Sequence, residues 1–334
     1  MVQPNIGILG TGFYVPEKVL TNDELEISLR LERNWIRSKT GIRERRVAAP
    51  HEATSDLATN AAGRALATAG IQADDLDLIV VATSTPDWPL PATACQVQAN
   101  IGATRAAAFD ISAVCAGFVY ALAIVQSAML GNTSFKKALI IGTDTYSRIL
   151  DYQDRRTCVL FGDGAGAVVL GQVPEGYGIL SCYIRSDGTG TSLVQIPAGG
   201  SRCPTSSRTL AEREHFFRMN GSAVRSFLQQ TFSEALYTVM EAADLGIQDI
   251  DLIVPHQANG VLLRERMQCL EIPPEKVCFT LEQYGNTAAA SVPITLHEAV
   301  SSNRVHDGNA VVLLSFGGGL TWGGVLLRWY RSHS

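Results

Sequence analysis

The chain has 334 residues, of which 46% are hydrophobic, so it can bury a large core in one or two domains. Its formal net charge is −5 and it has no long basic run. This argues against nucleic-acid binding, because that affinity depends on Lys and Arg clustered at phosphates. This composition and net charge are more typical of a soluble enzyme than of a binding module.

The expected location is the cytoplasm, with no membrane attachment. The chain opens without the basic and apolar segments of a signal peptide, and the apolar stretch 118–130 is too short, and too interrupted by Gln126 and Ser127, to span a bilayer. The seven cysteines are an odd number without close pairing, as expected of reduced intracellular thiols. Neither CxxC nor HxxxH spacing occurs, so we expect no metal site.

The elements expected along the chain form two similar halves. Residues 70–80 resemble residues 246–254, and each copy follows an alanine-rich helical segment and leads into a strand. Continuous apolar runs at 138–141 and 311–314 predict strands that helices cover on both faces. Similar units about half a chain apart indicate duplicated α/β halves rather than a solenoid.

The second half is expected to begin near Glu175, which divides the chain into residues 1–174 and 175–334. Within the second half, the stretch 197–209 turns to Gly, Ser, Pro, Arg and Cys without periodicity, which predicts a long surface loop. Such a loop is either a lid over a cleft or an insertion without a role.

Cys115 is the first candidate for chemistry. It lies in the segment 109–118, which ends a short strand-like run and opens an apolar helical stretch at 119–130. The dipole and the unpaired N–H groups of a helix N-terminus favour a thiolate, and small neighbours such as Gly117 leave room for an acyl group. The alternative is that Cys115 is a packing residue, as most buried cysteines are.

Two further segments present polar side chains where a cleft could form. The apolar strand at 251–255 ends on His256, and Asn286 follows the turn at Gly285 before a small-residue helix. Taken singly, His256 is compatible with a surface imidazole and Asn286 with a turn residue or N-cap. With Cys115 they form a Cys/His/Asn set, which a redox-sensing thiol protein would leave unexplained.

Motifs along nearly the whole chain follow one order: Trp35, Thr40-Gly41-Ile42-Arg43-Glu44-Arg45, Cys115-Ala116-Gly117, Phe161-Gly162-Asp163-Gly164-Ala165-Gly166-Ala167, His256-Gln257-Ala258-Asn259, Gly285-Asn286-Thr287 and Phe316-Gly317-Gly318-Gly319-Leu320-Thr321-Trp322-Gly323. This pattern resembles the β-ketoacyl-ACP synthase III family, the initiating condensing enzymes of type II fatty-acid synthesis in the thiolase superfamily. The resemblance implies an α/β fold of thiolase-like duplicated halves, packed as a five-layered α-β-α-β-α sandwich. The half 1–174 would carry the nucleophilic Cys, and the half 175–334 the His and Asn.

The resemblance also implies a decarboxylative Claisen condensation of an acyl-CoA primer with malonyl-ACP, through an acyl-Cys115 intermediate. His256 and Asn286 would stabilise the enolate that forms when malonyl-ACP loses CO₂, and a His256 imidazolium would favour the thiolate. Backbone N–H groups of Cys115 and Gly318 would hold the oxyanion of acyl transfer. Acyl-CoA and malonyl-ACP are substrates, so no cofactor is expected.

An indole and a guanidinium would sandwich the adenine of CoA, further cations would face its phosphates, and polar side chains would reach the pantetheine amides. The residues that the resemblance assigns to these roles are Trp35, Lys39, Arg43, Arg155, Ser222 and Asn259. The alternative for the charged run 37–46 is a solvated strand edge.

The chain departs from the family at the surfaces expected to meet the carrier protein and the acyl group. The arginine that usually follows the His-Gln-Ala-Asn motif is Val261, so we expect Arg264 or Arg266 to meet the acidic carrier protein. The family works as a homodimer in which a partner residue, Leu90 in this chain, caps the acyl channel. Leucine is smaller than the Phe common there, which favours branched or medium-length primers.

Two other functions on the same fold stay open. One is an acyltransferase or condensing enzyme of a secondary-metabolite pathway, of polyketide or quinolone type. Asn286 counts against versions of it that do not decarboxylate. The other is a catalytically silent partner subunit, against which the intact Cys115 argues.

Overall fold

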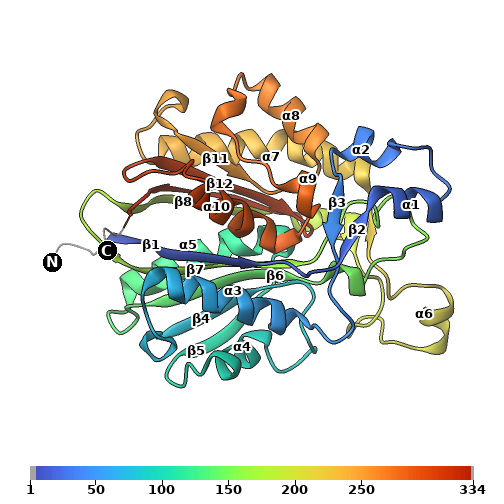
Figure 1. The fold of residues 1–334 in the computed structure, drawn as a ribbon, viewed down its shortest axis with the longest axis horizontal. Coiled ribbons are helices and arrows are strands. Elements are labelled where there is room, and N and C mark those ends of the chain that lie inside the picture. The colour runs from blue at the N-terminus through green and yellow to red at the C-terminus, as the bar shows by residue number, and fades with distance from the viewer. Residues whose placement is uncertain (1–4, 332–334) are drawn as a thin grey trace.

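Two β-sheets organise the fold, and each is built from one part of the chain (Figure 1). The computed structural model describes residues 5–331. The first sheet has the spatial order β1 (Asn5–Tyr14), β7 (Gly164–Val173), β6 (Ala138–Asp144), β4 (Leu78–Ala82) and β5 (Ala107–Ile111). The second has the order β11 (Leu252–Pro255), β12 (Ala310–Gly317), β13 (Thr321–Arg328) and β8 (Gly178–Ser186).

Helices cover both faces of each sheet. The outer face of the first sheet packs against α3 (Thr54–Ala69) and α4 (Thr93–Ile101), and the outer face of the second against α7 (Gly221–Glu241) and α8 (Gly260–Cys269). Between the sheets lie α5 (Gly117–Gly131) and α10 (Ser291–Ser301). This is the five-layered α-β-α-β-α order that the sequence resemblance predicts.

Smaller elements surround the end of the sandwich where Figure 1 shows α1 and α2. These elements are two short strand pairs and four short helices. The strand pairs are β2 (Val19–Thr21) with β3 (Glu44–Arg46) and β9 (Val194–Gln195) with β10 (Arg218–Met219). The helices are α1 (Asn22–Ser28), α2 (Trp35–Thr40), α6 (Ser207–Ala211) and α9 (Leu281–Tyr284). The predicted loop 197–209 runs into α6, which projects from the body of the protein (Figure 1).

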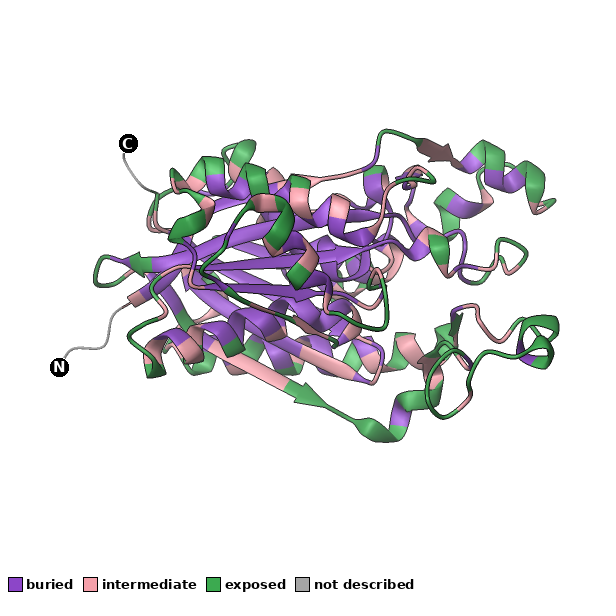
Figure 2. Ribbon diagram, turned by 90° about the horizontal axis from the view of Figure 1, so that it is seen from below, coloured by how far each residue is buried: buried purple, intermediate pink, exposed green. Residues whose placement is uncertain are grey.

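Burial explains why the central strands are apolar without alternation. Every residue of β6 is buried, and so are all but the last of β12, because helices lie above and below them (Figure 2). Helix α5 is apolar on all sides for the same reason: it contacts both sheets. By length and composition the segment Val114–Gly131 could cross a membrane, but 56% of it is buried inside the protein as a core helix.

The internal repeat predicted from the sequence corresponds to equivalent units in the two sheets. In the first, α3 leads through a 3-10 turn at Ala73–Asp75 into β4. In the second, α7 leads through a 3-10 turn at Ile247–Asp249 into β11. The two sheets draw their strands from opposite sides of the connection between β7 and β8. The division at residues 174 and 175 stays a prediction about domain organisation.

This architecture brings strand ends from both sheets together. Strand β4 runs parallel to β5 and β6, and β11 runs parallel to β12. Carboxyl ends of parallel strands face the same edge of a sheet, and residues just beyond them line clefts in open α/β sheets. Cys115 follows β5, Tyr146 follows β6 and His256 follows β11.

Candidate active site

Cys115 lies in a tight 3-10 turn, Val114–Ala116, immediately before α5. The residue before it, Val114, has φ of 49°, a conformation that costs energy for a β-branched residue and that typically marks a functional site. The Ser315 hydroxyl donates to the Cys115 carbonyl at 2.7 Å. A Cβ on Gly317 would lie 2.8 Å from the Cys115 nitrogen, so only glycine fits against the turn.

Burial dominates the acidity of the Cys115 thiol. The residue is only 7% exposed, and this burial, with the nearby Asp144 carboxylate, raises the pKa of the thiol well above its ordinary range. A backbone N–H lowers the pKa, but by less. Burial therefore favours the thiol form of Cys115 and opposes the thiolate expected at the helix N-terminus.

His256 is the first residue beyond β11, and it is 1% exposed. Its Nδ1 lies 2.6 Å from the Ser291 hydroxyl of α10, and its ring packs edge-on against Phe316 with centroids 5.2 Å apart. Burial lowers the pKa of His256 to about 3, so the imidazole is neutral. The expected imidazolium is wrong for the same reason. If Ser291 donates to Nδ1, Nε2 carries the proton and becomes a donor.

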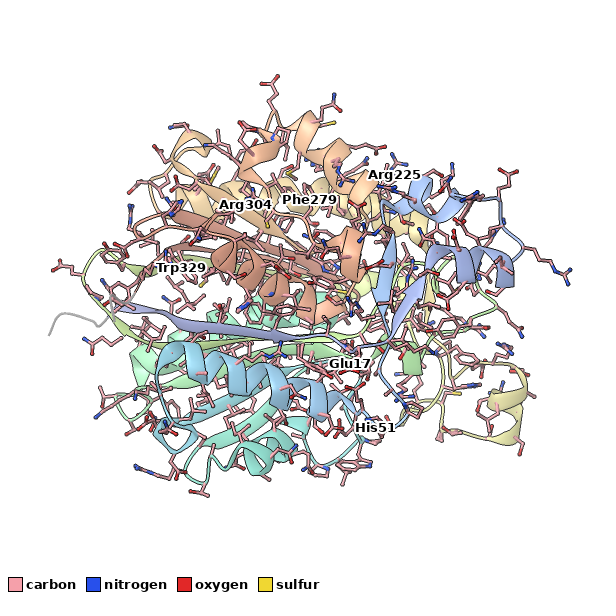
Figure 3. The ribbon with its side chains drawn as sticks, in the orientation of Figure 1. Glu17, His51, Arg225, Phe279, Arg304 and Trp329 are labelled. Carbon is pink, nitrogen blue, oxygen red and sulfur yellow. The ribbon has the colours of Figure 1, made fainter. Side chains whose placement is uncertain are left out.

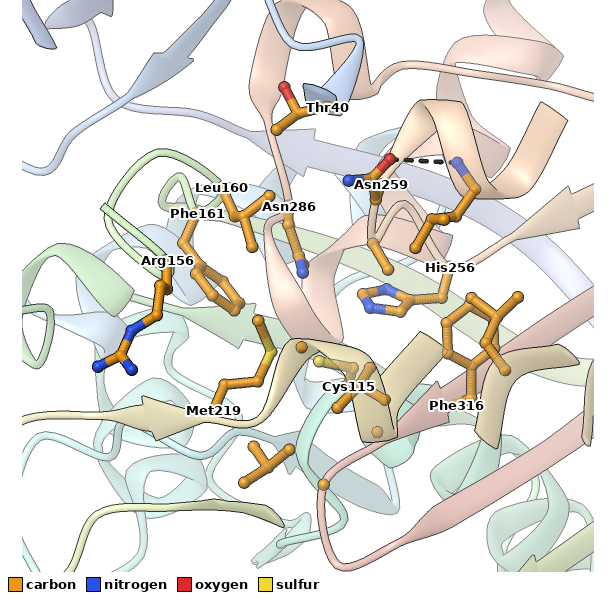
Figure 4. A pocket seen from close by; sticks show the side chains of 18 of the residues that line it. Thr40, Cys115, Arg156, Leu160, Phe161, Met219, His256, Asn259, Asn286 and Phe316 are labelled. Carbon is orange, nitrogen blue, oxygen red and sulfur yellow. Dashed lines mark hydrogen bonds between the residues drawn. The ribbon is translucent and has the colours of Figure 1, made fainter. Parts of the chain in front are cut away.

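Asn286 is held by both its backbone and its side chain. Its N–H donates to the Leu160 carbonyl at 2.8 Å, and its carbonyl accepts from the Gly162 N–H at 3.0 Å. Its Oδ1 accepts from the Ala288 N–H at 2.9 Å. Because Oδ1 is occupied, the Nδ2 amide is the group that Asn286 presents to the cavity, close to Cys115 and His256 (Figure 4).

One cavity of about 250 Å³ joins these three side chains to the surface. Cys115, His256 and Asn286 line it, and so does Gly318, which the sequence predicts as an oxyanion donor. The remaining wall is mainly apolar and includes Phe161, Met219 and Phe316 (Figure 4). Such a mostly apolar cleft with a few convergent polar groups is typical of a small-molecule site.

The mouth of the cavity carries most of the residues predicted for CoA. Trp35, Lys39, Arg155 and Asn259 all line it, and the Arg155 guanidinium lies over the Trp35 ring, 5.7 Å from its centroid. The Asn259 Oδ1 caps α8 by accepting from the Val261 and Leu262 N–H groups, and its Nδ2 donates to the Lys39 carbonyl. Asn259 therefore also joins α8 to α2.

Two residues predicted for CoA lie outside this cavity. The Arg43 guanidinium is 3.5 Å from the Glu44 carboxylate, and Arg43 is not among the residues that line the cavity. Ser222 lines a neighbouring groove and donates to Asn220, while the adjacent Gly221 lines the cavity itself. Their roles in binding CoA stay predictions.

The residues predicted for the acyl pocket and the carrier protein also lie apart from the cavity. Leu90 is 81% exposed and does not line the cavity of its own chain. Arg264 is exposed, and its guanidinium lies over the ring of Phe279, which is labelled in Figure 3. Arg266 donates to Ser233 of α7, so part of its guanidinium is engaged within the protein.

Sequence reasoning missed three residues that shape the site. Ser291, five residues after Asn286, binds His256, and Arg156, next to Arg155, lines the cavity mouth. Tyr146 lines the cavity near Cys115. No local motif marks any of them: the contacts of Ser291 and Tyr146 come from distant segments, and those of Arg156 come from the nearby Asp154. Within residues 5–331, no group of three or more His, Cys, Asp or Glu side chains is placed to hold a metal ion.

Comparison with known proteins assigns the chain to a family. Residues 109–188 match the family model of 3-oxoacyl-[acyl-carrier-protein] synthase III, and residues 240–329 match that of its C-terminal region. The chain is 50% identical over 326 residues to a β-ketoacyl-[acyl-carrier-protein] synthase III of Symbiobacterium thermophilum, with 98% of each chain covered. The chain belongs to the β-ketoacyl-ACP synthase III family.

Solved structures of similar proteins share the fold. The 3-oxoacyl-[acyl-carrier-protein] synthase III from Aquifex aeolicus is 40% identical with a TM-score of 0.89, over 97% of this chain and all of that one. The priming β-ketosynthase of the R1128 polyketide pathway is 30% identical with a TM-score of 0.91, over 98% of this chain and 97% of that one. As a member of the β-ketoacyl-ACP synthase III family, the chain is a condensing acyltransferase.

The raised pKa of Cys115 has a measurable consequence. The rate of Cys115 alkylation by iodoacetamide should keep rising about tenfold per pH unit up to about pH 9.5, because the thiol stays protonated across that window. For a free cysteine, with a pKa of about 8.5, the alkylation rate approaches a plateau in the same pH range. Peptide mapping by mass spectrometry gives the rate, with the exposed Cys95 as an internal reference. A plateau below about pH 8 would show that Cys115 is a thiolate at neutral pH.

Proposed function

We propose that this protein condenses an acyl-CoA primer with malonyl-ACP to give β-ketoacyl-ACP, CO₂ and CoA, the initiating step of fatty-acid synthesis. The observation that carries the proposal is the cavity's pairing of a nucleophile with two neutral donors. Cys115 comes from the first half of the chain, and the Asn286 amide and neutral His256 from the second. Neutral donors suit an enolate oxygen, which they stabilise at any working pH.

In the first half-reaction the Cys115 sulfur attacks the thioester carbonyl of acyl-CoA. The bond between the acyl carbon and the CoA sulfur breaks, and the proton of the Cys115 thiol passes to the departing CoA. The tetrahedral oxyanion would accept from the N–H groups of Cys115 and Gly318. Because burial raises the pKa of the thiol, its deprotonation is coupled to substrate binding rather than complete beforehand.

In the second half-reaction malonyl-ACP loses CO₂, and the electron pair of the broken C–C bond forms a thioester enolate. The Asn286 Nδ2 and the His256 Nε2 donate to the enolate oxygen. The enolate carbon then attacks the acyl group on Cys115, and the Cys115 thiolate leaves and takes up a proton from solvent. Removing one such donor costs roughly 2.7–4 kcal/mol in comparable sites.

The mouth of the cavity supports CoA as the primer carrier. We propose that Trp35 and Arg155 hold the adenine between indole and guanidinium, while Lys39 stands at the phosphates. The Arg155 and Trp35 groups would move apart to admit the base, because at 5.7 Å they already contact each other. The pantetheine arm would follow the apolar wall past Asn259 to Cys115.

We also propose a homodimer, in which the edge of the first sheet is shared between two copies. Within the described part of the chain, strand β5 pairs only with β4 and leaves its other edge unpaired. The residues of β5 are exposed or intermediate, whereas those of β4 are all buried. Exposed Trp88 and Leu90 lie on the connection that precedes α4. A second copy on this edge would cover these apolar groups and bring Leu90 to the partner's cavity.

We propose that the protein acts in the cytoplasm and needs no resident cofactor. All seven cysteines are free thiols, as in reducing compartments. Every step above uses groups of the chain and its two substrates. The secondary-metabolite alternative is not favoured: the relatives at 50% and 48% identity are named β-ketoacyl-[acyl-carrier-protein] synthase III, while the polyketide enzyme is 30% identical.

The Asn286→Ala variant separates the two half-reactions. It should still form an acyl-Cys115 adduct from acyl-CoA at close to the normal rate, but condensation with malonyl-ACP should fall by about 100-fold or more, because only the enolate uses the Nδ2 donor. Intact-mass measurement reports loading, and product formation reports condensation. Equal losses in both steps would rule out this role for Asn286, and Cys115→Ser serves as the control that fails to condense.

Arg264→Glu tests the carrier-protein surface. The KM for malonyl-ACP should rise about tenfold while acyl-CoA loading is unchanged, because the reversed charge repels an acidic carrier helix. The matched control is Arg105→Glu, which lies beside Asp74 and Asp75 away from the cavity. An unchanged KM in Arg264→Glu, or an equal rise in the control, would exclude Arg264 from the docking surface.

A further inference from the structure

A fully buried carboxylate joins the two halves of the chain next to the site. Asp144 is the last residue of β6, and none of its surface is exposed. An ionised carboxyl group is costly to bury unless hydrogen-bond donors surround it. We propose that Asp144 is a positioning residue for Asn286: it holds the turn that orients the Asn286 side-chain amide toward the cavity. This inference rests on the proposed function, in which that amide stabilises the enolate.

One oxygen of this carboxylate is held by the segment that follows β4, the strand beside β6. The Ser84 N–H and the Ser84 hydroxyl donate to Asp144 Oδ1 at 2.8 and 2.9 Å. The Thr85 and Thr83 hydroxyls donate to the same oxygen at 3.0 and 3.2 Å. Burial raises the pKa of Asp144 to about 6, and these donors oppose a further rise, so the group is ionised at neutral pH.

The other oxygen faces the turn that follows Asn286. Asp144 Oδ2 accepts from the Ala289 N–H at 3.0 Å. The preceding N–H in the turn, that of Ala288, donates to Asn286 Oδ1 at 2.9 Å. The Ala288 N–H decides which end of the Asn286 amide is the free donor, and the Ala289 N–H ties the same turn to β6. Loss of the Asp144 acceptor would therefore free the turn and the orientation of the Asn286 Nδ2 group.

The backbone of this turn is strained and tightly packed. Ala288 has φ of 48°, in the left-handed region that costs energy for a residue with a Cβ. The Ala289 carbonyl lies against Gly142 of β6, where a Cβ would come within 2.3 Å of the carbonyl oxygen. The charge-assisted hydrogen bond from the Ala289 N–H to Asp144 offsets part of the strain and holds the turn at this close approach.

The charge of Asp144 by itself opposes the chemistry of the site. After burial, this carboxylate is the next cause that raises the pKa of the Cys115 thiol, and a nearby negative charge also disfavours an enolate oxygen. Asp144 is not among the residues that line the cavity, so it acts through the turn. Removing its charge should leave Cys115 at least as reactive while it disturbs Asn286. Opposite effects on the two residues separate positioning from a general loss of structure.

The test is Asp144→Asn in the full-length protein. An Asn side chain cannot accept from both the Ala289 N–H and the Ser84 N–H, because one of its two ends is a donor. Condensation at saturating malonyl-ACP should therefore fall by about tenfold or more. Formation of acyl-Cys115 from acetyl-CoA, followed by intact mass, should stay within about threefold of wild type, and iodoacetamide should alkylate Cys115 at least as fast.

The matched control is Asp77→Asn. The Asp77 carboxylate also accepts from two backbone N–H groups, those of Lys136 and Lys137, at 2.8 and 3.0 Å. It lies directly before β4, at the opposite end of the parallel strands from Asp144. Both half-reactions of this variant should stay within about threefold of wild type.

A double-mutant cycle shows whether Asp144 acts through Asn286. In the Asn286→Ala background, Asp144→Asn should slow condensation by less than about twofold more, because the amide that it positions is gone. If Asp144→Asn fails to fold, Ser84→Ala removes one donor to the carboxylate and should slow condensation about threefold without slowing acyl loading.

Three results would overturn the inference alone: an undiminished loss in the Asn286→Ala background, an equal loss of acyl loading and condensation in the folded variant, or normal condensation by that variant. Normal condensation by Asn286→Ala itself would instead overturn the proposed function.

Discussion

The site depends on backbone-to-backbone contact between the two halves of the chain. A Cβ on Gly317 would lie 2.8 Å from the Cys115 nitrogen, and one on Gly142 would lie 2.3 Å from the Ala289 carbonyl oxygen. The two backbone hydrogen bonds that join Asn286 to Leu160 and Gly162 also connect the two halves of the chain. The nucleophile and the donors therefore reach their positions only when the sheets pack with α5 and α10 between them.

The same packing decides the chemistry that the three groups can perform. Burial raises the pKa of Cys115 and lowers that of His256 to about 3, so both groups are neutral, as Asn286 always is. A site of neutral donors in a mainly apolar cleft suits a reaction that creates negative charge on a thioester oxygen, because each donor keeps its proton while the charge develops. Ser291 contributes by fixing Nδ1 of His256 from α10, the helix shared by both sheets.

Those parts of the fold and of the candidate site that depend on short segments of sequence could be predicted. The apolar runs of β6 and β12, the repeat that leads into β4 and β11, and the positions of Cys115, His256 and Asn286 beside turns all follow from short segments. The protonation states could not be predicted, because they depend on burial. The contacts of Arg43 with Glu44 and of Arg266 with Ser233 could not be predicted either, because they depend on side-chain placement. Tyr146 was missed because its contacts come from Phe161, Phe217 and Ser84.

The most direct test of the account is CO₂ release from malonyl-ACP by protein without its nucleophile. If His256 and Asn286 stabilise the enolate independently of the thiol, Cys115→Ala should still release CO₂ without condensing, and Cys115→Ala/Asn286→Ala should release it about 100-fold more slowly or worse. Equal rates in the two variants, with both folded to the same thermal stability, would contradict the claim that the neutral donors of the second half drive decarboxylation.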